Sequence, residues 1–194
     1  MSEELKAQDL KELKAKAISQ PLVEHIYTAD PSAHVFDGRI YIYPSHDIEA
    51  GIPFNDNGDH FGMQDYHVLS LDGPGSPAVD HGVALDIKDV PWAERQMWAP
   101  DAARKDGKYY FYFPAKKPDG IFQIGVAVAD SPIGPFKAQP QAIAGSYSID
   151  PAVLKTMTAA FICILAVFGA DSYKTTATIS TALTMQNRQQ LSQL

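Results

Sequence analysis

Residues 34–45, HVFDGRIYIYPS, place an Asp-Gly pair between two runs of β-prone side chains. An Asp-Gly pair in this setting favours a tight two-residue hairpin, because both central residues must adopt positive φ angles. The same design returns in residues 103–115, ARKDGKYYFYFPA, where the second run is almost entirely aromatic. The sequence therefore predicts two antiparallel hairpins, with turns at Asp37–Gly38 and Asp106–Gly107.

An aspartate precedes each of the two predicted hairpins in a similar local frame, and a third aspartate occurs in the same frame further along the chain. Asp30 lies in TADPSAHVF, Asp101 in WAPDAARKD and Asp150 in SIDPAV. An acid-bearing strand, a tight turn and an aromatic strand thus recur about every 50 to 70 residues, a period typical of β-propellers, whose blades are four-stranded sheets. The alternative is another all-β fold that shares Asp-Gly hairpins. The predicted fold is all-β, with two to three propeller blades.

The composition is that of a globular chain: 45% of its 194 residues are hydrophobic and 20% are charged. The net charge of −7 disfavours nucleic acid as a partner, because phosphate binding needs clustered Lys and Arg. The first residues lack the apolar core of a signal peptide, and the apolar run 159–170 is shorter than the roughly 20 residues of a membrane helix. We therefore expect a cytoplasmic protein with no membrane partner.

The composition changes after Val153. Residues 154–194 contain one Gly, one Asp, no Pro and no Glu, and no Asp-Gly pair follows where a third hairpin is due. A one-nucleotide frame change after the Val153 codon explains this break, because the shifted codons permit an Asp-rich turn followed by alternating aromatic residues. The alternative is a divergent segment in the correct frame. We expect the segment to form no propeller strands.

Three segments are therefore predicted along the chain. The leucines at positions 5, 10 and 13 indicate a short amphipathic helix within an N-terminal extension over residues 1–20. Residues 21–153 form the partial propeller, and residues 154–194 form an aberrant tail that lies out of frame.

Residues 29–47, 96–116 and 148–153 together resemble glycoside hydrolase family 43. Members of that family are five-bladed β-propeller enzymes that act on polysaccharides containing arabinose and xylose. The resemblance implies inverting hydrolysis that releases terminal arabinofuranosyl or xylosyl units from hemicellulose-derived oligosaccharides. It covers about residues 20–153, so the chain resembles a truncated member with the first two to three blades.

The resemblance also implies roles for individual residues. Asp30 matches the general base of the family, Asp150 matches the residue that orients the general acid and tunes its pKa, and Trp98 matches a residue lining the sugar pocket. Two carboxyl groups with separated pKa values are the chemistry that glycoside hydrolysis requires. No residue of this chain matches the family's general acid, a glutamate, so the chain is expected to be an inactive fragment.

His46 and Asp47 follow the first aromatic strand, where loops reach the propeller axis, and are candidate sugar contacts. Other interpretations stay open: the two Asp-Pro aspartates can initiate turns, and the tryptophan can be a core residue. Asp101 is expected to be structural.

No cofactor is required by this chemistry, and the resemblance implies at most a structural calcium ion in the intact fold. The six histidines show no metal-binding spacing, so no metal site is predicted. NDNGD, residues 55–59, lacks the distal glutamate of a calcium loop and is interpreted as a turn. Two alternatives remain: a non-catalytic carbohydrate-binding propeller fragment, and an oligomer whose second copy completes the ring.

Overall fold

The computed structural model describes residues 12, 14–155 and 161–166. Within the expected N-terminal helix, Glu12 and residues 14–16 are helical. The three leucines that predict this helix lie outside the described residues. No helix among the residues described is long and apolar enough to cross a membrane.

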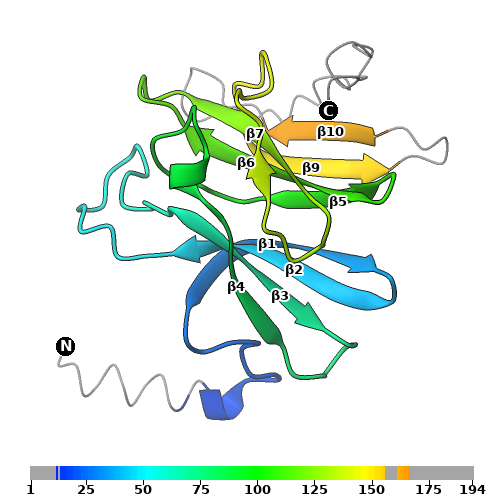
Figure 1. The fold of residues 1–194 in the computed structure, drawn as a ribbon. Helices are drawn as coiled ribbons and strands as arrows, with labels where there is room; N and C mark the ends of the chain where they lie inside the picture. Colours follow the sequence, from blue (N-terminus) through cyan, green and yellow to red (C-terminus); the bar gives the residue numbers. More distant parts are fainter. Residues whose placement is uncertain (1–11, 13, 156–160, 167–194) are drawn as a thin grey trace.

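Two four-stranded antiparallel sheets form the body of the molecule, each with its strands in sequence order (Figure 1). The first sheet contains β1 (Tyr27–Phe36), β2 (Arg39–Asp47), β3 (Asp65–Leu71) and β4 (Val79–Asp86). A 3₁₀ turn, η1 (Ile87–Asp89), follows it. The second sheet contains β5 (Asp101–Lys105), β6 (Lys108–Lys116), β7 (Phe122–Ala129) and β8 (Lys137–Ala138).

Both predicted Asp-Gly turns are confirmed. Asp37 and Gly38 have φ angles of 51° and 81°, and Asp106 and Gly107 have 50° and 78°. Positive φ at both central positions gives the turn a twist that matches the flanking strands, so each turn fixes the register of its hairpin. β1 therefore pairs with β2, and β5 with β6, immediately on either side of the turn.

A third strand pair consists of β9 (Ile149–Lys155) and β10 (Phe161–Ala166). The two strands are antiparallel, and Val153 lies opposite Cys163. We expected residues 154–194 to form no propeller strands, and that expectation is wrong for residues 154–155 and 161–166, which lie in this antiparallel pair. The sequence FICILA is apolar and rich in β-branched residues, which suit the pleated edge of a neighbouring strand without any Asp-Gly turn. The other residues of that tail lie outside the described part of the chain.

The main core lies between the first two sheets and is built from alternate residues of the two aromatic strands. Tyr43 of β2 and Phe111 of β6 are fully buried, with ring centroids 5.7 Å apart. Tyr66 of β3 packs edge-on against Phe111 at 4.9 Å, and its hydroxyl donates to the Trp98 carbonyl at 2.6 Å. The other face of β6 is buried as well, where Tyr112 packs in a second cluster with partly buried Val153.

Burial on both faces explains why the aromatic run of β6 is continuous. The second sheet lies between the first sheet and β9, and Figure 1 shows β9 against β5 and β6. Each sheet thus packs face to face on the next, as blades of a propeller do. The prediction of an all-β chain with two to three blades is confirmed.

Gly125 on β7 offers a direct test of this packing. A Cβ atom at Gly125 would lie 2.5 Å from Phe113 Cζ and 2.6 Å from Trp92 Cζ2. Because Phe113 is fully buried and Trp92 packs against the same core, Gly125→Ala should lower the free energy of unfolding by about 1–3 kcal/mol in urea titrations. Gly73→Ala is the matched control, since no atom lies within 4 Å of its added Cβ. Equal effects of the two substitutions would contradict this packing.

Candidate active site

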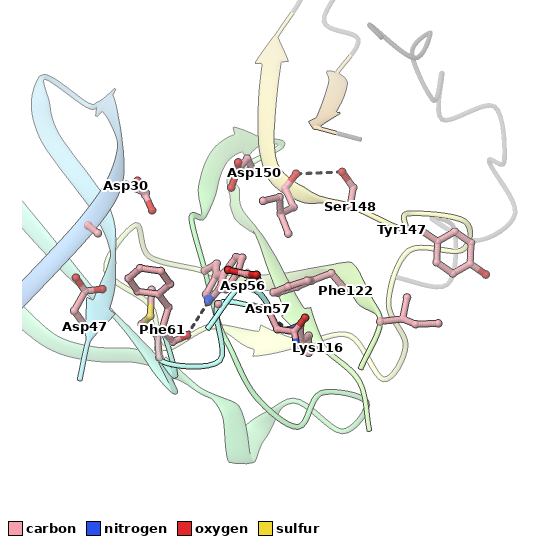
Figure 2. Close-up of a pocket in the computed structure, with 16 residues that line it drawn as sticks. Asp30, Asp47, Asp56, Asn57, Phe61, Lys116, Phe122, Tyr147, Ser148 and Asp150 are labelled. Atoms are coloured by element: carbon pink, nitrogen blue, oxygen red, sulfur yellow. Dashed lines mark hydrogen bonds between the residues drawn. The ribbon is translucent and has the colours of Figure 1, made fainter. Parts of the chain in front are cut away.

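A pocket of about 630 Å³ opens where the first sheet, the second sheet and β9 converge. Its four acidic lining residues come from β1, the end of β2, the loop before β3 and the start of β9. Figure 2 shows Asp30 and Asp47 on one side and Asp150 on the yellow strand across from them. Three residues predicted from sequence, two of them from Asp-Pro motifs, therefore meet at one cavity.

The two Asp-Pro motifs occupy the same kind of β-bulge. In β1 the pairing with β2 is interrupted between Ala29 and Ser32, so Asp30 and Pro31 bulge out. In β9 the partners jump from Ile149 to Ala152, which places Asp150 and Pro151 in the equivalent position. A bulge re-aims a side chain and suits proline, which cannot donate to the ladder.

Both bulged aspartates also have left-handed backbone angles. The φ angle is 45° at Asp30 and 50° at Asp150. Positive φ is uncommon for residues other than glycine and occurs preferentially at Asp and Asn. Such angles outside tight turns concentrate at functional sites, where the surrounding structure maintains them. The repeated conformation therefore separates these two aspartates from ordinary turn-capping acids.

Burial and the Asp30 carboxylate raise the pKa values of two neighbouring carboxyl groups. Partial burial raises the pKa of Asp150, and the nearby Asp30 carboxylate raises it further. Burial also raises the pKa of Asp47, Asp30 adds to that effect, and His46 opposes it. One oxygen of Asp47, Oδ1, is buried without a hydrogen-bond partner among the residues described. The pocket therefore holds carboxyl groups with pKa values displaced from their ordinary range, which acid–base chemistry uses.

This shift predicts a pH-dependent stability effect at Asp150. Because its pKa is higher in the folded state, the folded chain binds more protons than the unfolded chain. The contribution of Asp150 to stability is thus greatest below the unfolded pKa of about 3.9 and is lost as pH rises. Asp150→Asn should melt at a higher temperature than the parent chain at pH 7, and the difference should disappear near pH 3. A lower melting temperature of the variant at pH 7 would contradict the shift.

Three aromatic side chains, Phe61, Trp98 and Phe122, line the same pocket as the carboxylates and form what we call the aromatic wall. Trp98 packs on Phe122 with centroids 4.5 Å apart and meets Phe61 edge-on at 6.3 Å. Its indole Nε1 donates to the Phe61 carbonyl at 2.8 Å, which fixes the ring plane. The loop NDNGD closes over this ring: a Cβ at Gly58 would lie 3.0 Å from Trp98 Cη2, and its φ of +68° also favours glycine. Trp98 is therefore a half-buried, oriented platform.

Lys116 contacts both the loop of residues 55–59 and the aromatic wall. Its Nζ donates to the Asn57 carbonyl at 3.3 Å and lies 3.6 Å from Asp59 Oδ1. The ammonium also sits 4.9 Å from the centre of the Phe122 ring and 5.9 Å from that of Trp98. Burial lowers the pKa of Lys116, and the Asp59 carboxylate opposes that effect.

Not every predicted residue reaches the pocket. His46 points to the other face of β2, where its Nδ1 bonds Asp65 Oδ1 at 2.6 Å, and it does not line the cavity. NDNGD is a turn as predicted, since Asn55 Oδ1 accepts from the backbone N–H groups of Asn57 and Asp59. Sequence analysis did not identify this loop as part of the pocket.

Asp101 is buried and does not line the pocket. Its Oδ1 accepts from His34 Nε2 at 2.6 Å and from the backbone of Ala102 at 2.8 Å, and Oδ2 accepts from the backbone of Val153 at 2.6 Å. These bonds connect β1, β5 and β9. Asp101 therefore joins three layers of the fold, as expected of a structural residue.

Comparison with known proteins places this chain in a family. The model of glycosyl hydrolases family 43 matches residues 18–164, well over half of the chain. A xylosidase/arabinosidase 43A of Humicola insolens is 65% identical over 135 residues, which cover 69% of this chain and 41% of that relative. A xylosidase/arabinosidase of Bacteroides ovatus is 59% identical over 68% of this chain and 41% of its own length.

Solved structures that resemble this chain belong to the same family. A β-xylosidase/α-arabinofuranosidase from a compost metagenome, determined with xylotriose in a calcium-free form, has a TM-score of 0.73 and 68% identity, over 74% of this chain and 44% of its own. The GH43_1 enzyme of Xanthomonas citri with xylotriose has a TM-score of 0.73 and 58% identity, over 83% of this chain and 47% of its own.

The chain belongs to glycosyl hydrolases family 43. It spans less than half the length of these relatives. The matched segment ends at residue 164, within β10, so the family resemblance continues past Val153.

Proposed function

We propose that this chain carries the base-bearing part of an inverting glycosidase that releases terminal xylosyl or arabinofuranosyl units from hemicellulose-derived oligosaccharides. The observation that carries the proposal is the pair Asp30 and Asp150, which share a bulged, left-handed conformation and line one pocket. Relatives named xylosidase/arabinosidase, and structures determined with xylotriose and xylose, support the substrate class.

In the proposed mechanism Asp30, as its carboxylate, removes a proton from a water molecule that attacks the anomeric carbon. Inverting enzymes place base and acid about 6.5–9.5 Å apart to leave room for that water. Asp150, whose pKa is raised by burial and by Asp30, orients the acid and keeps its proton affinity high. Trp98 and Phe122 provide the apolar face against which a sugar ring stacks.

The general acid lies outside this chain in our proposal. No glutamate follows Glu94 in the sequence, and none lines the pocket among the residues described. A general acid contributes about 10²–10⁴-fold to the rate. The 194-residue chain should therefore hydrolyse 4-nitrophenyl β-xyloside at trace rates at most.

The experiment compares this chain with a completed domain. In the completed domain, residues 1–153 of this chain are followed by the part of the Humicola insolens relative that comes after the position aligned with Val153. The completed domain should hydrolyse 4-nitrophenyl β-xyloside or α-arabinofuranoside at least about 100-fold faster than the 194-residue chain. Equal, robust activity of the two proteins would contradict the proposal.

A structural calcium ion stays a proposal for the intact family fold, and one group of potential ligands among the residues described does not suit it. The group that brings three potential side-chain ligands together there contains two imidazoles, whereas Ca²⁺ takes oxygen ligands. No step of the proposed mechanism passes through a metal ion.

The aromatic wall also favours a second function, carbohydrate binding without catalysis. Xylotriose should bind the 194-residue chain weakly, and Trp98→Ala should weaken that binding about fivefold, because an aromatic contact is worth about 1 kcal/mol. Titration followed by NMR measures both affinities. Tyr27→Ala is the control, since that ring is exposed and outside the pocket. If Trp98→Ala binds as tightly as the parent chain, the wall is not a sugar platform.

A further inference from the structure

Three potential metal ligands gather on the face of the first sheet opposite the main core. His46 is the second-last residue of β2, and Asp65 begins β3. Ser45 pairs with Tyr66 in the antiparallel register, so His46 and Asp65 are neighbours across the two strands. His67 lies two residues beyond Asp65 on the same strand, so its side chain points to the same face. Ser45, which precedes His46, and Tyr66, which lies between Asp65 and His67, are fully buried on the opposite face.

The geometry of this group is close to that of a metal site. The three ligand atoms lie within 4.8 Å of one another. Asp65 Oδ1 is 2.6 Å from His46 Nδ1 and 3.9 Å from His67 Nε2. In a tetrahedral zinc site with bonds of about 2.0–2.1 Å, ligand atoms lie about 3.3 Å apart. The two distances fall on either side of that value, so small side-chain rotations satisfy it.

A second layer of contacts already orients one of the imidazoles. His67 Nδ1 lies 3.0 Å and 3.1 Å from the two oxygens of Asp80 on β4. The backbone N–H of Gly82 and the ring of His25 hold the same carboxylate, at 2.8 Å and 2.7 Å. A carboxylate on one ring nitrogen leaves the other nitrogen as the lone-pair donor, which is the arrangement found behind metal-ligating histidines.

We propose that His46, Asp65 and His67 form a Zn²⁺-binding site. Two imidazole nitrogens and one carboxylate oxygen suit zinc, whereas calcium and magnesium prefer oxygen alone. Zinc replaces the proton between His46 Nδ1 and Asp65 Oδ1. His46 then carries its single proton on Nε2, so the imidazole stays neutral, as metal binding requires. Three protein ligands leave a fourth position for water. The side chains are 12–20% exposed, so an ion can enter from solvent.

The consequence for the fold is local. Bound zinc fixes the end of β2 to the start of β3, and Asp47, the next residue of β2, lines the glycosidase pocket. The site lies on the opposite face of that strand and does not depend on the proposed hydrolysis.

The test uses the tag-free 194-residue chain, stripped with EDTA and titrated with zinc chloride by calorimetry. We expect one zinc ion per chain. His67→Gln should abolish binding, and Asp80→Asn, which keeps the shape but weakens the supporting carboxylate, should lower affinity about 10–100-fold. His81→Gln is the matched control on the same sheet, since His81 bonds Ser70 instead, and it should leave the affinity unchanged.

Amide hydrogen exchange supplies a local readout. Zinc should slow exchange in β2 and β3 of the parent chain and leave β5–β7 unchanged, and the slowing should be absent in His67→Gln. Unchanged exchange in β5–β7 between the two proteins shows that the variant keeps its fold. Failure of the parent chain to bind one equivalent of zinc, or equal losses in His67→Gln and His81→Gln, would overturn the proposal and leave the group as a hydrogen-bond network.

Discussion

Asp30→Asn in the completed domain should lower kcat/KM by about 10²–10⁴-fold, the contribution of a general base. Asparagine keeps the volume and tolerates the φ of 45° at this position, so the variant should fold as the parent does. The loss should persist with 4-nitrophenyl leaving groups, because an easily displaced group still needs an activated water. Initial-rate kinetics with the xyloside and the arabinofuranoside measure the effect.

The control for this experiment is Asp56→Asn. Asp56 lines the same pocket but occupies neither a bulge nor a left-handed conformation. Its removal tests whether any loss of pocket charge slows the reaction. If Asp30→Asn and Asp56→Asn have the same kcat/KM, Asp30 is not the base.

Asp101→Ala should lower the free energy of unfolding of the 194-residue chain by about 2–5 kcal/mol. The substitution leaves the backbone N–H groups of Ala102 and Val153 without their acceptor, and it removes the partner of His34. Each buried donor left unpaired costs about 1–3 kcal/mol. Urea unfolding followed by tryptophan fluorescence gives the value.

The matched control is Asp130→Ala. That carboxylate is 85% exposed and pairs only with Lys108 among the contacts seen, so its loss should change stability by about 0.5 kcal/mol or less. Similar effects of the two substitutions would show that Asp101 does not join the three layers. The two variants therefore separate a buried structural acid from a surface ion pair.

The hairpins were predictable because an Asp-Gly pair between β-prone runs favours a two-residue turn through its local backbone preferences alone. The turns at Asp37 and Asp106 adopt the left-handed angles that the dipeptide favours, and register follows from the turn. The Asp-Pro motifs at residues 30 and 150 could also be recognised in the sequence, because a charged residue before proline interrupts a strand. The packing of the blades brings the two aspartates into one pocket. Local sequence does not predict that packing, and here the expectation came from the family resemblance.

Other parts depended on contacts between distant segments. Lys116 ends an aromatic strand and gave no local signal, yet it braces the residue 55–59 loop against Trp98. His46 was assigned to the sugar pocket together with Asp47 because both follow the first aromatic strand, but successive residues of a strand point to opposite faces. The zinc ligands come from two strands separated by a long loop, so no histidine spacing in the sequence reveals them.

The tail shows the limit of composition as a guide. Residues 161–166 lack the Asp-Gly turn and the alternating aromatics of the other hairpins, yet they pair with β9. Strand pairing needs only a backbone and side chains that suit a pleated surface. A frame change after Val153 stays our proposal for the altered composition, and it places an aromatic strand at the same positions. Resequencing the DNA around that codon tests it.

The stereochemistry of the first sugar released tests the central claim most directly. If Asp30 activates a water on the face opposite the leaving group, proton NMR of the completed domain acting on 4-nitrophenyl β-xyloside should show α-xylose first, with β-xylose appearing later by mutarotation. Initial release of β-xylose would mean that a carboxylate attacks the sugar directly, and would contradict Asp30 as a general base.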